Sequence, residues 1–172
     1  MGNKHTQAGF TLMELMVVVA IAAILATIAA PSFNSLINDT KQSSLASQLV
    51  SDLHRARSEA IKRNTRVVLC VRNSAGTDCG TGTNWQNGWL ICYGNTACDT
   101  TIPTDGSAAN PLSTHPPLDS KLTLTGSGNL IRFNPNGTQG SAGSASLTLN
   151  GTWSAATAQT ITVAATGYIS KH

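Results

Sequence analysis

Apolar and polar residues divide the chain into parts with different periodicities. Residues 10–31 are almost entirely apolar, and a helix needs about 20 such residues to cross a bilayer. In residues 45–60, apolar side chains recur every three or four positions, as on one face of an amphipathic helix. We therefore predict one helix over about 11–64. Pro31 lacks a backbone donor, so a bend is expected near Thr27.

After the helix, short apolar runs alternate with threonine and serine, a pattern typical of strands with one buried face. Alternate apolar positions are expected to face the helix, which predicts an α+β fold. Asn-Pro-Asn-Gly at 134–137 and Asn-Gly at 150–151 predict turns, and the proline-rich segment 96–117 predicts a long flexible connection. The predicted strands are 66–72, 89–93, 121–125, 130–133, 146–149 and 160–165. The side chains expected to face the helix are Leu122, Leu124, Leu147, Leu149, Ile161 and Val163.

Glu14 is the only charged residue in the apolar segment 10–31. A charge at the centre of a membrane helix costs roughly 2.5–3.5 kcal/mol on insertion scales, so Glu14 is expected to need a partner. The preceding residues are basic and contain no acid, which predicts that they stay cytoplasmic. Cleavage after Gly9 would create an amino group on Phe10. That amine, on a neighbouring subunit, could neutralise the Glu14 carboxylate.

The segment 9–14, Gly-Phe-Thr-Leu-Met-Glu, resembles the processing motif of type IV pilins and pseudopilins. In that family a dedicated peptidase cuts after the glycine and methylates the new terminus. The resemblance implies cleavage between Gly9 and Phe10 and N-methylation of Phe10. The family's assembly glutamate and proline match Glu14 and Pro31. Two other interpretations stay open: a secretory signal cut near the end of the apolar run, and a plain membrane anchor.

The rest of the chain resembles the GspH/FimT class of minor pilins and pseudopilins. In that class a long N-terminal helix packs on antiparallel sheet. The matching segments are Leu-Cys-Val-Arg-Asn at 69–73, Asp-Cys-Gly at 78–80, Asn-Trp-Gln-Asn-Gly-Trp at 84–89, Ile-Arg-Phe-Asn-Pro-Asn-Gly at 131–137 and Thr-Gly-Tyr at 166–168. The resemblance implies a leader over 1–9, a transmembrane and filament-core helix over 10–31, an amphipathic helix over 32–64 and a β-rich periplasmic head over 65–172.

This resemblance implies a minor type IV pilin, a structural subunit that helps to start pilus assembly at or near the filament tip. Its expected partners are major and minor pilins, prepilin peptidase and the pilus assembly machinery. Its expected location is the bacterial inner membrane, with the head in the periplasm, and then the filament at the cell surface. A GspH-type pseudopilin of type II secretion stays open, and so do roles in twitching motility and natural transformation.

Four cysteines, at 70, 79, 92 and 98, have none of the Cys-x-x-Cys spacings of zinc sites, and no nearby histidine completes one. An exported domain favours disulfides. The favoured pairs are Cys70–Cys79 and Cys92–Cys98, because each would close a short polar loop. Each bridge is expected to add about 2–3 kcal/mol to the stability of the domain. The other two pairings stay open.

The chain offers little for catalysis. Only 11% of its residues are charged, and no glutamate follows Glu59. Only His115 and His172 lie beyond the predicted helix, and nothing suggests a nucleophile with its base. The sequence therefore predicts no enzyme, no catalytic residue, no cofactor and no metal.

DNA is a less favoured partner. Some FimT-type proteins that this chain resembles bind incoming DNA through a Gly-Arg-x-Arg element in the tail, but residues 167–170 here read Gly-Tyr-Ile-Ser. The remaining weak candidates are Tyr168 and Lys171, with Arg63 and Arg66 from a basic stretch near the helix end. Cations there also stabilise the helix dipole, which is the favoured interpretation. The net charge of +3 does not by itself indicate a nucleic-acid partner.

Overall fold

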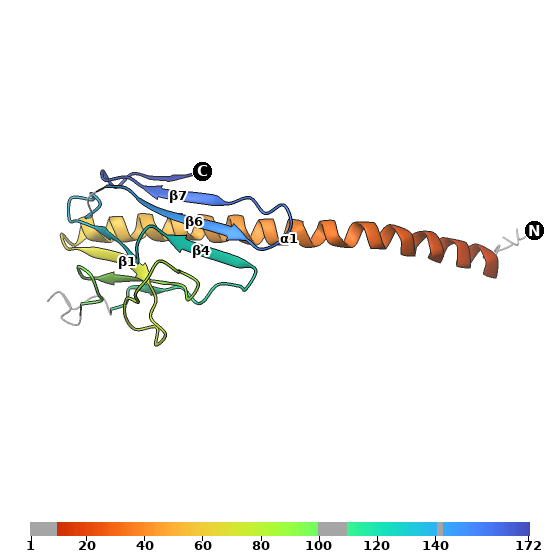
Figure 1. Cartoon of the computed structure of the whole chain (residues 1–172), viewed down its shortest axis with the longest axis horizontal. Helices are drawn as coiled ribbons and strands as arrows, with labels where there is room; N and C mark the ends of the chain where they lie inside the picture. The colour runs from red at the N-terminus through yellow and green to blue at the C-terminus, as the bar shows by residue number, and fades with distance from the viewer. Residues whose placement is uncertain (1–9, 100–109, 141–142) are drawn as a thin grey trace, which may run out of the picture. The chain divides into compact units, whose positions relative to one another are not determined.

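The computed structural model describes residues 10–99, 110–140 and 143–172, without the side chains of 28–32 (Figure 1). The chain forms two compact units, Met1–Ile37 and Asn38–His172. Helix α1 covers Leu12–Lys62 and is continuous across Pro31, as predicted. The bend expected there concerns how the two units sit relative to each other and stays a prediction.

Residues that flank α1 cap the helix at both ends. At the first turn, the Thr11 hydroxyl accepts the Glu14 N–H at 3.2 Å, as an N-cap residue does. At the other end, Asn64 adopts a left-handed conformation with φ 50°. The Thr65 N–H then reaches back to the Ala60 carbonyl at 3.1 Å, which closes a Schellman-type cap. The helix therefore ends where the 11–64 prediction placed it, apart from the capping residues.

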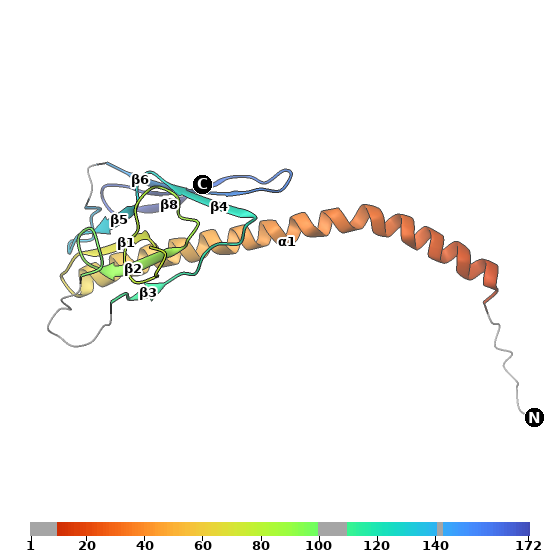
Figure 2. The ribbon, with the colours of Figure 1, turned by 60° about the horizontal axis from the view of Figure 1, so that its bottom comes forward.

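Two antiparallel four-stranded sheets follow the helix, which confirms the α+β fold (Figure 2). The first has the order β3-β2-β1-β5 and contains β1 Val67–Val71, β2 Trp89–Tyr93, β3 Ser113–Thr114 and β5 Leu130–Phe133. The second has the order β4-β6-β7-β8 and contains β4 Leu122–Gly126, β6 Ala145–Gly151, β7 Gln159–Val163 and β8 Ile169–Lys171. The sequence did not predict β3 and β8, because they are too short to show a period.

The helix stripe and both sheets share one core. Leu49 and Leu53 are fully buried on α1, together with alanines at 46, 56 and 60. All six sheet side chains predicted to face the helix belong to this core, none more than 5% exposed. The alternation along β4 and β6 confirms the prediction, with threonines between the buried leucines on the outer face.

The outer face of the first sheet is also covered. Val68, Cys70, Leu90 and Cys92 form a second, smaller buried cluster on that face. Cys70 bonds Cys79 and Cys92 bonds Cys98, which is the pairing favoured from sequence. The loops that these disulfides close lie over the strands, so β1 and β2 are buried throughout.

Of the two turn predictions, one is right and one is wrong. Residues 134–137 form a turn in which Gly137 has φ 78° and donates its N–H to the Asn134 carbonyl at 2.8 Å. Residues 150–151 instead extend β6, because they pair with Thr123 and Leu122 of β4. The flexible connection predicted over 96–117 lies partly outside the described residues. Its described end forms β3 and is hydrogen-bonded to β2.

Candidate assembly sites

The amino-terminal candidates lie at the start of α1. Phe10 precedes the first turn and is 81% exposed, and Glu14 is the acid of that turn. An acid at this position is favourable toward the positive end of the helix dipole. Gly9 lies outside the described residues. Over the described side chains 12–27, Glu14 is the one charged residue on a helix surface that is otherwise mostly apolar.

Large apolar side chains cover this surface on all sides of the helix. Ile24 and Leu36, for example, are 63% and 60% exposed in the single chain. Continuous apolar surface of this kind marks a contact with a partner or with lipid. Within the part of the chain that the structure describes, no helix is long and apolar enough to cross a membrane. The membrane span over 10–31 therefore stays a prediction.

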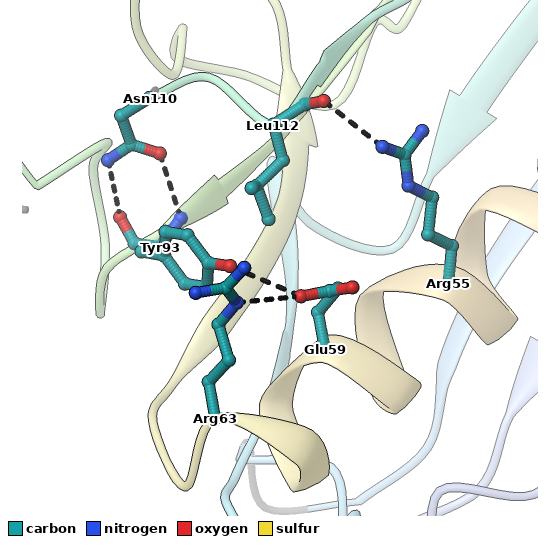
Figure 3. Close-up of polar contacts among 6 residues, drawn as sticks. All are labelled: Arg55, Glu59, Arg63, Tyr93, Asn110 and Leu112. Carbon is teal, nitrogen blue, oxygen red and sulfur yellow. Dashed lines mark hydrogen bonds and ion pairs between the residues drawn. The ribbon is translucent and has the colours of Figure 1, made fainter. Parts of the chain in front are cut away.

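A polar network joins the end of α1 to β2 (Figure 3). The Glu59 carboxylate accepts hydrogen bonds from the Tyr93 hydroxyl at 3.2 Å and from Arg63 Nε at 3.0 Å. Partial burial would raise the pKa of Glu59, but the bonds from Arg63 and Tyr93 and the nearby Lys62 hold it below its ordinary value. The network fixes the last turns of α1 against the first sheet.

The same network holds the segment before β3. Asn110 accepts the Tyr93 N–H at 3.0 Å and donates to the Tyr93 carbonyl at 3.0 Å, while Arg55 donates to the Leu112 carbonyl at 3.3 Å (Figure 3). Sequence reasoning missed Asn110. An asparagine before a proline reads as an ordinary turn signal, and only the structure shows that its amide pairs with a strand.

Trp89 is buried against α1, and its indole N–H has a hydrogen-bond partner there. Its indole N–H donates to the Asp52 carboxylate at 2.8 Å, and the His115 ring stacks on it with 3.7 Å between ring centroids. Trp85 is fully buried and donates to the Gly128 carbonyl at 3.0 Å. Both tryptophans therefore belong to the core.

One group of potential metal ligands lies between the disulfide loops. It contains Asp78, Cys79 and Cys98, whose ligand atoms lie within 4.8 Å of one another. Both sulfurs are in disulfides and so are not available as thiolates. Asp78 Oδ1 instead accepts the backbone N–H groups of Cys79 and Cys98 at 2.7 and 2.8 Å. Asp78 thus connects the two loops, a role that its loop position in the sequence did not reveal.

The DNA-binding candidates differ in what surrounds them, and Arg66 is exposed after the end of α1. Arg63 is engaged with Glu59 and lies over the Tyr93 ring, 5.5 Å from its centroid. Tyr168 is 67% exposed beside β8, and Lys171 is exposed at the end of that strand. Arg57, also in the basic stretch, donates to the Gly137 carbonyl at 2.9 Å. Several cations therefore have structural partners within the chain.

The long helix, the two antiparallel sheets and the exposed acid near the start of an apolar helix define a type IV pilin-like protein. The family model described as type II transport protein GspH matches residues 45–167, and that of the prokaryotic N-terminal methylation motif matches residues 4–30. The chain therefore belongs to the GspH family and is a GspH/FimT-like pilin. Pilins and pseudopilins of this family are structural proteins rather than enzymes.

Individual relatives agree with this assignment. The type IV major fimbrial protein FimA of Dichelobacter nodosus is 36% identical over 85 residues, which are 49% of this chain and 47% of FimA. The chain thus spans about half the length of that curated relative. Two crystal structures of the type IV minor pilin FimU of Pseudomonas aeruginosa share the fold. Their TM-scores are 0.57 and 0.54 at 19% and 20% identity, with 77% and 76% of this chain covered and 89% and 91% of theirs.

Proposed function

We propose that the chain is a minor type IV pilin whose residues 10–31 anchor the precursor in the inner membrane and then enter the filament core. The match of residues 4–30 to the N-terminal methylation motif supports this proposal. The partners are major and minor pilins, prepilin peptidase and the pilus assembly machinery. The head lies in the periplasm before assembly and at the cell surface afterwards, where the subunit helps to start the filament.

One observation carries the proposal: Glu14 lies in the first turn of an apolar helix whose large side chains are exposed in the single chain. Such a helix must be covered, and a carboxylate that is covered without a partner costs several kcal/mol. Cleavage after Gly9 supplies a cation at Phe10. The amine of an adjacent subunit then pairs with Glu14, which sets the register between subunits rather than adding much net stability.

The test compares three variants of the full chain in cells. Glu14→Ala and Glu14→Gln remove the charge, and Glu14→Asp keeps it. Recovery in sheared filaments should fall strongly for the first two and remain highest for Glu14→Asp. Terminal sequencing of each sample should find methylated Phe10, and protease resistance should show a folded head. Normal recovery of Glu14→Gln in filaments would refute the pairing.

A pseudopilin of type II secretion is a second candidate, and the name of the matching family model favours it. Both machines use the same kind of anchor, so the anchor does not separate the two roles. A deletion strain separates the two roles. Loss of twitching with normal protein secretion supports the pilus role, and loss of secretion with normal twitching supports the secretion role. Transformation measured in the same strain tests the less favoured DNA role.

A further inference from the structure

Two of the four sheet edges of the head, β5 and β4, are covered by the chain's own loops. Beside β5, the Gly140 N–H donates to the Arg132 carbonyl at 2.7 Å. Beside β4, the Trp85 N–H donates to the Leu124 carbonyl at 2.9 Å and the Gly126 N–H to the Thr83 carbonyl at 2.9 Å. Covering an edge in this way prevents it from pairing with another chain. The edge strand β3 is only two residues long.

β8 is different, because half of its backbone groups point away from the sheet. Thr160 and His172 exchange both N–H···O bonds, at 3.0 and 2.8 Å, and the Ala164 N–H donates to the Tyr168 carbonyl at 2.8 Å. In an antiparallel ladder, hydrogen-bonded pairs alternate with pairs that direct their groups outward. The pairs containing Ile169 and Lys171 are therefore the outward ones.

The outward groups of β8 have no cover in the described chain. Across residues 10–99, 110–140 and 143–172, no segment bonds to the outward N–H or carbonyl of Ile169 or Lys171. The Ile169 side chain is 8% exposed and so holds the strand against the core, while Tyr168 beside it is 67% exposed. β8 thus offers a fixed, open ladder with an aromatic ring at one end.

We propose that β8 accepts an extended backbone segment of a neighbouring pilin subunit, which adds to the second sheet as a further strand. This inference rests on the proposed function, since the filament supplies the neighbour. Addition of a strand to a sheet edge is a common mode of recognition in which main-chain bonds give the affinity. The added segment pairs opposite Ile169 and Lys171.

The occupant follows from the size of the edge. Two outward residues bury far less than the roughly 1,200 Å² of a stable free-standing interface. Such a small contact contributes to binding only when its partner is already held nearby, because tethering raises the effective concentration of the partner. Subunits tethered side by side by their N-terminal helices meet this condition, whereas a freely diffusing protein does not.

The variant Lys171→Pro tests the inference in the full chain. Lys171→Pro removes an outward N–H without touching the bonds to β7, and edge strands tolerate proline. Lys171→Ala is the matched control, because it removes the charge and keeps the N–H. We expect about tenfold lower recovery of Lys171→Pro in sheared filaments, as the loss of one backbone bond implies, and unchanged recovery of Lys171→Ala.

A cross-link gives a second measurement that does not depend on proline. A photo-crosslinkable residue at Tyr168 should form an adduct with a neighbouring subunit in filaments. The same residue at Thr123, exposed on β4 beside the covered edge, should form much less. Equal adducts at both positions would overturn the inference.

The recovery experiment separates the two proposals. Equal loss for both Lys171 variants would indicate a side-chain charge contact and overturn strand addition. Recovery of Lys171→Pro at the level of the wild type would overturn it as well, while the proposed function stood. Absence of the wild-type chain from filaments would refute the proposed function, and this inference with it.

Discussion

Gln42 gives a direct test of how the head holds the helix. It lies on α1 with 2% of its surface exposed, and its amide donates to the Leu149 carbonyl at 3.1 Å and to the Thr157 carbonyl at 2.8 Å. These two bonds join the helix to the end of β6 and to the connection that leads into β7. Gln42→Met keeps the length and the helix propensity of the side chain but removes both donors.

The expected loss follows from the two bonds. Each neutral hydrogen bond contributes roughly 0.5–1.5 kcal/mol net, and a buried acceptor left unpaired adds to the loss, so the variant should lose about 2 kcal/mol. With a urea dependence of about 1–3 kcal/mol per molar, the unfolding midpoint should fall by about 1 M. Tryptophan fluorescence of the full chain in detergent reports on the head alone, because all 3 tryptophans lie there.

Gln48 is the matched control. It lies on the same helix, is exposed, and its side chain has no hydrogen bond in the described structure. Gln48→Met should shift the free energy of unfolding by no more than about 0.5 kcal/mol. If the two variants unfold at the same urea concentration, the Gln42 bonds add nothing net and the reasoning fails.

Two further perturbations address the polar network and the disulfides. The pKa of Glu59 is below its ordinary value in the folded head, so its contribution to stability is present above pH 4.5 and is lost as the pH falls through the lower folded value. The urea midpoint of Glu59→Gln should therefore depend less on pH below about 5 than the midpoint of the wild type does. The same pH dependence in both proteins would contradict this. Replacing both Cys92 and Cys98 with serine should lower the free energy of unfolding by about 2 kcal/mol relative to the wild type, because the bridge closes a short loop. An unchanged urea midpoint would mean that the bridge adds nothing to stability.

Periodic elements were predictable from sequence because burial imposes the period. The stripe through Leu49 and Leu53 and the alternation in β4 and β6 report directly on the core. The wrong turn at 150–151 has the opposite origin. Asn-Gly favours a turn locally, but pairing with β4 outweighs that preference and moves the turn to the residues after 151.

Polar residues that face the sheets were not predictable. Gln42 and Asp52 carry the same kind of side chain as the solvent face of an amphipathic helix, and the sequence does not say which of them meets a carbonyl or an indole. Hydrogen-bond partners more than thirty residues away leave no local period. Such residues become visible only when strand order is known.

Strand order also explains why one candidate surface could be predicted and the other could not. Glu14 stands out in the sequence because a charge conflicts with its apolar surroundings, and the conflict itself points to a missing partner. The outward ladder of Ile169 and Lys171 conflicts with nothing in its neighbourhood. It is open only because β8 lies last in the order β4-β6-β7-β8 and no loop returns to cover it in the described chain. On both proposals a neighbour in a filament completes the single subunit, because it supplies a cation for Glu14 and a strand for β8.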